Sequence, residues 1–528
     1  MSVPAPRARP GAAGSPDSSD LGRFGYGQQL RRDVGPFASF AAGFSFVSIL
    51  TTVFQLFGLG FSFGGAGFFW TWPLVFAGQL LVALCFAELA ARYPISGAVF
   101  QWSSRLAGTD IGWFTGWVMV IGQVLTVATA AIALQAVVPA IWSGFQLVGG
   151  AGADSSPLSA TGAQNAVVLG SALLVLTTVV NAIGVRLMAV ITSVGVVVEI
   201  VGVIALIVAL FSHAERSPAV VMTTRGAGEG NYLFLWLASS LMAAYVMVGF
   251  DSAGELAEET RAPRATTPRT ILRALIASGV GGALILVGGV VAAPSLLDGE
   301  LAAGGLAHVL TARLGDVGGR LLLATVAIAV VVCTLAVQTS GSRMVYSMAR
   351  ERAFPFASAL GRVSARTGTP IGAAVLVGLG AALTLAVNWK QSAVFTALTS
   401  LCIALLYLAY LGVTLPLLVR RLRGQLPDGV DEFGRPLFSL GRWGVPVNVL
   451  AVLYQVVMVV NLAWPRASVY DLTGGTWWLQ YSALLFIAAT LLVGALCHSR
   501  NRARHGGPIV LGAAQTSTPN PAPVEEPA

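Results

Sequence analysis

The chain has 528 residues, of which 55% are hydrophobic and only 10% are charged, and its formal net charge is +8. An ordinary soluble domain carries roughly 25% charged residues, so this composition excludes a soluble globular protein and indicates a protein that resides in the lipid bilayer. A nucleic-acid partner is not expected, because no basic run is interleaved with exposed aromatic residues.

Apolar runs of about 20 residues, the length needed to cross a hydrocarbon core of about 30 Å, occur along most of the chain. Hydropathy therefore predicts an all-α integral membrane protein with 12 transmembrane helices. The expected spans are 36–57, 67–91, 111–141, 165–184, 188–211, 232–256, 271–293, 319–346, 370–388, 393–419, 444–464 and 476–497.

The two ends of the chain lack such runs. Residues 1–35 are rich in Pro, Gly, Ser and Arg, and residues 498–528 have no apolar periodicity, so both are expected to be disordered tails. No small-residue cleavage site follows a short apolar core, so no cleaved signal peptide is expected. Among the 31 Lys and Arg residues, 25 fall on the side that holds both tails, and the positive-inside rule makes that side cytoplasmic.

Cysteine and histidine give no sign of a metal or cofactor site. The four cysteines lie within or at the end of expected spans, where they are interpreted as small core residues: Cys85, Cys333, Cys402 and Cys497. The four histidines lie at span ends or in loops and tails, without the spacing of metal ligands. No cofactor is therefore expected.

Polar residues interrupt two of the spans. In residues 43–54 the first span contains four hydroxyl side chains, Ser45, Ser48, Thr51 and Thr52. The sixth span contains Gly249, which weakens a helix by about 1 kcal/mol relative to Ala, and Asp251, which would cost about 2.5 to 3.5 kcal/mol if charged at a lipid-facing midplane. Both helices are expected to break there, and five spans separate them, as in a protein built from two five-helix halves.

Four carboxylates cluster at the second break. Asp251 is interpreted either as orienting the unwound backbone or as sensing a substrate amine. Glu255 follows one helical turn later and faces the same interior side, where it could pair with a basic residue in gating or scaffolding, or handle a proton. Glu258 and Glu259 are expected in a surface ion network at the cytoplasmic boundary, with Arg261, Arg264 and Arg269.

Two further carboxylates lie in other spans. Glu199 lies deep in the fifth span, and no residue nearby in sequence neutralises it. Burial without a partner favours the protonated carboxyl near neutral pH, which suits either proton exchange or a permanently protonated structural role. Glu88, at the cytoplasmic end of the second span, is interpreted mainly as structural, with a coupling or gating role as the alternative.

Three motifs follow the second, sixth and eighth spans: FAELAARYPISGAVFQWSSRLAG (86–108), GFDSAGELAEETRAPRATTPRTIL (249–272) and TSGSRMVYSMARERAFP (339–355). In these motifs and their order, the chain resembles the amino acid, polyamine and organocation (APC) superfamily of permeases over residues 30–495. It is most similar to the amino acid and choline transporter branch.

The resemblance implies the leucine-transporter fold, with a first five-helix repeat at 36–211, an inverted second repeat at 232–419 and two peripheral helices at 444–497. It also implies a substrate site. The segment that would hold a substrate carboxylate against backbone amides matches Ser48, Ile49, Leu50, Thr51 and Thr52. The second break contributes Gly249, Phe250 and Asp251, and Tyr245 matches an aromatic residue that covers the substrate in relatives or, alternatively, only packs in the bundle.

The sequence departs from the family in two places. Thr51 and Thr52 replace the glycine pair usual in the first break, where their hydroxyls would bind substrate or cap the broken helix. Glu199 stands where several proton-coupled relatives carry a lysine. Thr339 and Ser340 resemble the hydroxyl positions of a sodium site, although two hydroxyls are too few to argue for a cation. Arg343 and Arg350 are expected as partners of Glu255 or Glu88.

These features predict a secondary transporter that moves an amino acid or small amine, coupled to protons. A choline, polyamine or γ-aminobutyrate exchanger and a non-transporting nutrient sensor are the alternatives, and the oligomeric state is open. An enzyme is not expected, because the buried polar residues form no catalytic cluster, and an ATP-driven pump would need a P-loop that is absent. Lys390 is the only lysine, and this arginine-rich composition suits a GC-rich bacterium and its inner membrane.

Overall fold

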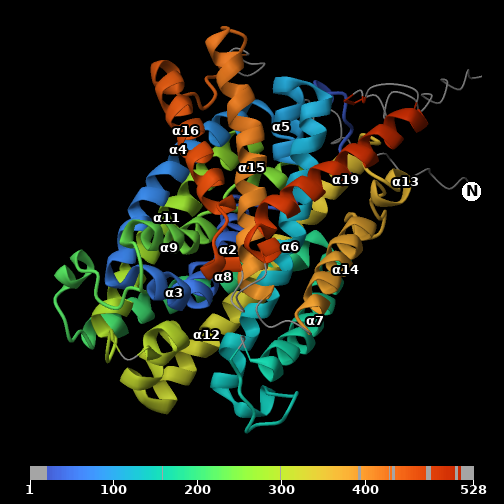
Figure 1. Ribbon diagram of the computed structural model, residues 1–528. Coiled ribbons are helices and arrows are strands. Elements are labelled where there is room, and N and C mark those ends of the chain that lie inside the picture. The colour runs from blue at the N-terminus through green and yellow to red at the C-terminus, as the bar shows by residue number, and fades with distance from the viewer. Residues whose placement is uncertain are drawn as a thin grey trace, which may run out of the picture.

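A computed structural model describes residues 21–156, 159–297, 299–389, 394–426, 429–430, 434–470, 477–505, 509 and 511–512, except for the side chains of 394–398 and 505. Within these residues the regular secondary structure is helical, accompanied by three isolated β-bridges. Helices of unequal length cross one another in one bundle (Figure 1). The all-helical class predicted by hydropathy is confirmed.

Nine helical stretches of the described residues are long and apolar enough to cross a membrane. The first joins α2 (Pro36–Val47), α3 (Ile49–Gly64), η1 (Gly65–Trp70) and α4 (Thr71–Arg92), and the others are α6 (Thr109–Ile141), α7 (Ala160–Ile183), α8 (Val185–Ser212), α11 (Pro263–Ala292), α12 (Glu300–Arg350), α15 (Val394–Leu422), α16 (Gly444–Ala463) and α19 (Ser482–His505). Two shorter apolar helices, α9 (Tyr232–Val246) and α14 (Ile371–Val387), fall within the expected spans 232–256 and 370–388. A multi-pass membrane protein is supported, whereas the exact number of crossings stays a prediction.

Glycines set several boundaries in this series. The 51 residues of α12 contain non-helical backbone at Gly305 and Gly315, where φ is +54° and +64°, so the expected span 319–346 is only the last part of that element.

Short elements lie between the long ones: α5 (Ala98–Ala107), η2 (Ser143–Phe145), η3 (Pro218–Met222), α10 (Ser252–Glu255), η4 (Ala257–Glu259), α13 (Ala357–Leu360), η5 (Gly441–Trp443), α17 (Ala467–Tyr470) and α18 (Trp477–Gln480).

The interrupted helices lie in the middle of the bundle. Helix α2 packs against α8, α11 and α12, while α3 packs against α9 and α12. Helices α16 and α19 lie further out and pack against α15 (Figure 1). In lipid, irregular backbone is tolerated only where protein surrounds it, so this central position explains how the chain can interrupt these helices.

The N-terminal segment differs from the expectation of a disordered tail. Residues 21–35 pack on the bundle with Leu21, Tyr26 and Leu30 buried, and a parallel bridge joins Val34 to Thr260. Short segments become ordered when other elements supply an apolar surface, which composition alone does not reveal. Residues 498–505 continue α19, so this part of the expected C-terminal tail is also ordered, and residues 1–20, 506–508, 510 and 513–528 lie outside the described residues.

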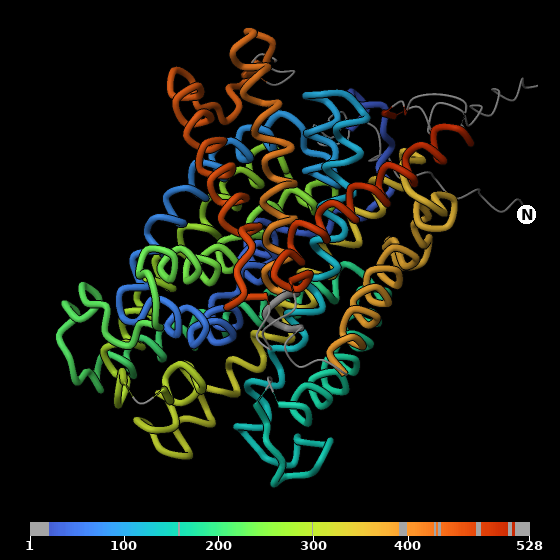
Figure 2. Tube along the Cα trace, viewed as in Figure 1, coloured from blue at the N-terminus to red at the C-terminus, as the bar shows by residue number. Residues whose placement is uncertain are grey.

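The first and last described segments meet on one face of the bundle (Figure 2). A Cβ added to Gly25 would lie 3.4 Å from the Cα of Gly512, and the amide of Gly512 donates to Glu351 Oε2 over 2.9 Å. This face, defined by residues 21–35 and 511–512, is called the terminal face below. The prediction that both ends share one side agrees with this contact.

Glu258 and Glu259 are fully buried, so the prediction of a surface ion network is wrong. Arg350 donates to both carboxylate oxygens of Glu258 over 2.9 Å, and Arg343 Nη2 lies 3.0 Å from Glu259 Oε1. Both arginines come from the end of α12, nearly a hundred residues away in sequence. The pairing depends on tertiary packing, and it joins α12 to the segment after the second break.

Arg343 and Arg350 were expected to pair with Glu255 or Glu88, and that prediction is also wrong. Glu88 instead accepts from Arg421 Nη2 over 2.5 Å and lies 2.7 Å from Arg92 Nη1. Glu88 therefore ties α4 to the end of α15, which is the structural role favoured by its position in sequence.

The described cysteines are free. Cys85, Cys333 and Cys402 are buried, and Cys497 is partly buried. Among the described residues, no group of three or more His, Cys, Asp or Glu side chains could hold a metal ion.

Removing one partner from the buried pair of Glu258 and Arg350 should cost far more stability than breaking a surface pair. Glu258→Gln removes the carboxylate that Arg350 meets with two hydrogen bonds and leaves Glu351, 3.7 Å from Nε, as its other acidic partner, so we expect a loss of about 3 to 5 kcal/mol of unfolding free energy. Asp316→Asn is the matched control, because the Asp316 and Arg320 side chains are 85% and 55% exposed and such pairs contribute at most about 1 kcal/mol. Thermal unfolding of the purified protein in detergent measures both effects. Equal losses in the two variants would contradict the assignment.

Candidate functional site

The first break is a single residue. Helix α2 ends at Val47, Ser48 adopts a left-handed conformation with φ of +35° and ψ of +81°, and α3 starts at Ile49. A non-glycine residue in this region is uncommon and costs roughly 1 to 2 kcal/mol. The chain therefore breaks within the predicted segment, and surrounding contacts must hold Ser48 in this conformation.

Most of the segment expected to be unwound is helical. Ile49, Leu50, Thr51 and Thr52 form the first turn of α3. The Thr52 hydroxyl turns back and donates to the carbonyl of Ser48 over 2.8 Å. The same hydroxyl lies 3.2 Å from the carbonyl of Val47, the last residue of α2, so its backbone contacts favour the capping role over a direct substrate contact for Thr52.

Glu199 reaches the first break from α8. Its Oε1 accepts the Ser48 hydroxyl over 2.9 Å and faces the amide of Leu50 at 3.4 Å, and Ser48 Oγ also lies 2.8 Å from Thr51 Oγ1. The first amides of a helix have no partner within the helix and carry partial positive charge, so they favour an anion or hydrogen-bond acceptor. The Glu199 side chain thus occupies the N-terminus of α3.

The other Glu199 oxygen, Oε2, is buried and has no hydrogen-bond partner among the described residues. The side chain itself is 1% exposed. A buried carboxyl oxygen without a partner is unfavourable unless the group is protonated or meets a ligand. This position is consistent with either role predicted from the sequence.

The second break is longer. Helix α9 ends at Val246, and α10 starts at Ser252. Gly249 has φ of +91°, and a Cβ at this position would lie 1.7 Å from Cδ1 of Phe46, which belongs to α2. Only glycine satisfies both conditions, because it tolerates positive φ and has no side chain to keep the Phe46 ring away from the backbone. The two breaks therefore touch each other.

A tyrosine from α15 holds the second break. The Tyr410 hydroxyl accepts the amide of Gly249 over 2.9 Å and donates to Asp251 Oδ1. Phe250 packs against the rings of Tyr410 and Phe86, with centroids 5.4 and 5.9 Å away. Asp251 therefore orients the unwound backbone through Tyr410. Its second oxygen, Oδ2, is buried without a hydrogen-bond partner among the described residues, so the amine-sensing role stays open.

Two more predicted residues lie near the breaks. Tyr245 is buried in α9, and its hydroxyl lies 3.0 Å from that of Thr129 in α6. Glu255 is fully buried one turn after Asp251, and its carboxyl faces the backbone amides of Gly97 and Val99 at the start of α5. Two carboxyl groups in one apolar environment cannot both be charged at low cost, so at least one proton is expected on this pair.

The hydroxyls considered for sodium lie elsewhere. Thr339 donates to Asn181 of α7 over 2.8 Å, and Ser340 accepts from Gln123 of α6 over 3.1 Å. The α12 side chain that faces the first break is instead Cys333, whose sulfur lies 3.6 Å from the carbonyl oxygen of Phe46. Thr339 and Ser340 therefore each pair with another helix, and the sodium site at these hydroxyls stays a prediction.

Sequence reasoning missed Tyr410, Phe46, Cys333 and Thr129. Tyr410 gave one usable signal, a polar aromatic residue in the middle of the apolar span 393–419, because a buried Tyr hydroxyl usually finds a partner. Phe46 and Cys333 gave none, since an apolar side chain and a buried thiol look like ordinary core residues.

Two interrupted helices that meet around buried carboxyl and hydroxyl groups define a class, the multi-pass membrane transporter with an interior polar site. The sequence profile of the amino acid permease family matches residues 34–489. The chain therefore belongs to the amino acid permease family, within the APC superfamily to which it was assigned by resemblance.

Relatives agree with this assignment. Amino-acid permease BAT1 of Arabidopsis thaliana is 29% identical over 515 residues, which cover 93% of this chain and 95% of that protein. Its homologue in Oryza sativa subsp. japonica is 28% identical with the same coverage. Thiamine transporter thi9 of Schizosaccharomyces pombe is 23% identical over 85% of this chain and 80% of its own length. The family and these relatives support a transporter rather than an enzyme.

Replacing Tyr410 tests whether the second break belongs to the working site. Tyr410→Phe leaves the Gly249 amide and Asp251 without their partner, so we expect a loss of about 1 to 3 kcal/mol in unfolding free energy and a lower rate of solute uptake. Tyr407→Phe is the matched control, because Tyr407 is equally buried and its hydroxyl contacts that of Tyr454 at 2.9 Å. The control should lose similar stability yet keep its uptake rate in proteoliposomes. A similar loss of uptake in both variants would contradict a specific role for Tyr410.

Proposed function

We propose that this protein is a secondary active transporter that moves an amino acid or a small amine by alternating access. The observation that carries the proposal is the contact of Gly249 with Phe46, which brings two helix breaks together in the centre of the bundle. Broken helices expose backbone amides and carbonyls that an unbroken membrane helix would satisfy internally, and these groups can bind a polar solute.

The proposal includes the leucine-transporter fold with 12 transmembrane helices. The inverted five-helix repeats would be formed by residues 36–211 and 232–419. The two peripheral helices would be formed by residues 444–497. Breaks in the first and sixth of the expected spans support this arrangement, because each repeat would then begin with its interrupted helix. Both termini would be cytoplasmic, since 25 of the 31 Lys and Arg residues fall on the side of the expected topology that holds both tails.

The site would open alternately to the two sides of the membrane. Ser48, Tyr245 and Asp251 are each at most 3% exposed, which supports a closed state around the site. On the terminal face, the buried pairs of Glu258 and Glu259 with α12 would have to separate before solute could leave. Because each pair joins different helices, its separation would accompany movement of one part of the bundle against another.

A substrate carboxylate would bind at the N-terminus of α3, where the first-turn amides are available. Glu199 occupies that end through Leu50 and Ser48, so substrate binding would have to displace or share this contact. The unpartnered oxygen of Asp251 favours an amine on the substrate. The second candidate function is exchange of choline, a polyamine or γ-aminobutyrate. One relative is named a thiamine transporter, so the family also includes a protein named for a substrate other than an amino acid.

Proton coupling would pass through Glu199, with Glu255 as a second proton site. Protonation of Glu199 would neutralise the carboxylate that competes with substrate for α3, which links proton and substrate binding in the same place. Glu88 is less suited to this role, because two arginines hold it. A bacterial inner membrane stays a prediction from composition, and the relatives named above are plant and fungal proteins.

A ligand screen tests the proposed function directly. Amino acids, choline, polyamines and γ-aminobutyrate are added to the purified protein, and a ligand that binds only the folded state raises the unfolding temperature by mass action. Counterflow of the labelled hit in proteoliposomes then separates a carrier from a channel or a sensor, because only a carrier exchanges solute one for one. Binding without counterflow would favour the nutrient sensor and overturn the transporter.

Neutralising Glu199 should uncouple transport from the proton gradient. We expect wild-type uptake to rise when the outside is made acidic, and Glu199→Gln to take up solute at a rate that no longer responds to this gradient. Glu229→Gln is the matched control, since Glu229 lies exposed in a loop between η3 and α9. Uptake is measured in proteoliposomes with an imposed pH difference. A wild-type protein indifferent to the gradient would rule out proton coupling.

A further inference from the structure

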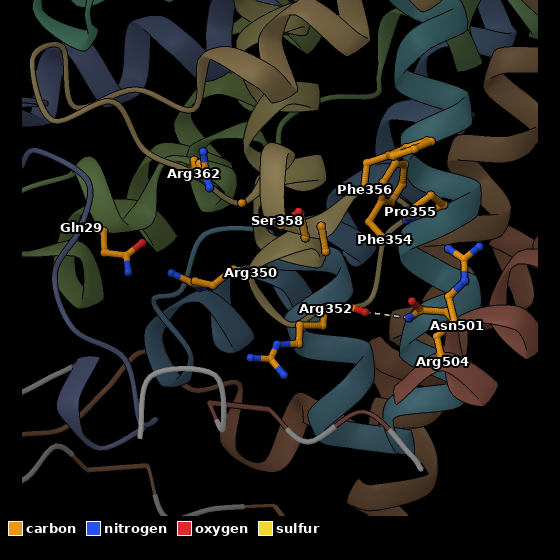
Figure 3. A pocket seen from close by; sticks show the side chains of 13 residues that line it. Gln29, Arg350, Arg352, Phe354, Pro355, Phe356, Ser358, Arg362, Asn501 and Arg504 are labelled. Carbon is orange, nitrogen blue, oxygen red and sulfur yellow. Dashed lines mark hydrogen bonds between the residues drawn. The ribbon is translucent and has the colours of Figure 1, made fainter. Parts of the chain in front are cut away.

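A basic pocket opens on the terminal face, away from the proposed transport site. It has a volume of about 580 Å³ and lies between the end of α12, the loop to α13 and the C-terminal end of α19. Figure 3 shows the arginines and aromatic residues around it. Four arginines line the pocket: Arg350, Arg352, Arg362 and Arg504.

Three of these arginines carry uncompensated charge. The Arg350 guanidinium is engaged by Glu258, but Arg352, Arg362 and Arg504 are exposed and form no ion pair with an acid among the described residues. The pocket has no acidic residue in its lining. Guanidinium groups match phosphate oxygens in geometry as well as in charge, so this lining favours a phosphate-bearing anion.

The loop that forms the pocket is held in place. Asn501 of α19 donates to the carbonyl of Arg352 over 2.6 Å, the dashed contact in Figure 3. Arg352 and Phe356 both adopt left-handed backbone, with φ of +56° and +57°. Such conformations cost of order 1 kcal/mol each in non-glycine residues and persist only where neighbours fix them. The pocket is therefore preformed.

Apolar groups accompany the charge. Phe356 is 83% exposed at the rim, and α19 presents Leu492 and Leu496, 64% and 53% exposed, on the stretch leading to Asn501 and Arg504. The pocket rim therefore offers exposed apolar surface beside its arginines. A soluble anion would need only the arginines, whereas a lipid would use both the arginines and this apolar surface.

We propose that this pocket binds the phosphate headgroup of an anionic phospholipid in the leaflet on the terminal face. The headgroup contacts Arg352, Arg362 and Arg504, and the acyl chains lie along α19. Basic pockets beside membrane helices recognise anionic headgroups by this combination of charge and apolar contact. The inference is independent of the proposed substrate, because no residue of the two helix breaks lines the pocket.

The test uses the full chain in detergent, with phosphatidylglycerol, phosphatidylcholine or glycerol phosphate added at equal concentration. We expect phosphatidylglycerol to raise the unfolding temperature and the other two to have little effect. In the triple variant Arg352→Gln, Arg362→Gln and Arg504→Gln, the apparent affinity for phosphatidylglycerol should fall roughly tenfold or more. Native mass spectrometry, which counts bound lipids, gives a second readout that does not depend on unfolding.

The matched control removes the same charge from exposed arginines outside the pocket, as Arg269→Gln, Arg273→Gln and Arg423→Gln. It should keep the lipid effect. An equal loss of phosphatidylglycerol affinity in both triple variants would mean that diffuse surface charge, and not the pocket, binds the lipid. A rise in unfolding temperature with glycerol phosphate equal to that with phosphatidylglycerol would mean that the pocket binds a soluble phosphate. If the Glu525 and Glu526 carboxylates fill the pocket instead, deletion of 513–528 would create a lipid effect that the full chain lacks. Each of these outcomes overturns the proposal.

Discussion

The close approach of Gly249 to Phe46 is the contact on which the interior of this protein depends. A membrane helix can leave backbone groups unpaired only where protein replaces the missing partners. At the second break Tyr410 supplies that partner, and at the first Thr52 and Glu199 supply it from inside the bundle. A side chain at Gly249 would separate the two breaks, and each would then have to satisfy its own polar groups among apolar helices.

At the first break the Glu199 side chain serves the structure and, in the proposed function, would also take part in transport. Glu199 accepts from Ser48 and faces the Leu50 amide, so it stabilises a left-handed residue that would otherwise be strained. The same contact fills the part of α3 best suited to an anion. A solute that competes for this end acts on the carboxyl group directly, and no long pathway of coupled residues is then needed. The resemblance implies that several proton-coupled relatives carry a lysine where this chain has Glu199. The difference matters because a carboxylate can occupy an anion-binding helix end, whereas a lysine cannot.

Hydropathy was sufficient to predict the helical membrane class, and composition was sufficient to place the two breaks near Ser48 and Gly249. Their partners were not predictable. Glu258 and Glu259 were assigned to the nearest arginines in sequence, but a buried carboxylate pairs with whichever cation the fold delivers, here from α12. Ser48, at the first break, donates to Glu199, which is 151 residues away in sequence. The order in residues 21–35 likewise depends on surfaces that other helices provide.

In the proposed transport cycle, the buried ion pairs on the terminal face would suit a closure that also has to open. Removing two charges from water costs about as much as their attraction returns, so such a pair adds little net stability compared with apolar packing. It is nevertheless specific, because Arg350 meets both oxygens of Glu258 in one geometry only. When the helices separate, water enters and hydrates both ions, which lowers the cost of the open state. An apolar contact of the same area would offer no such compensation, so these charges favour one closed arrangement without locking it.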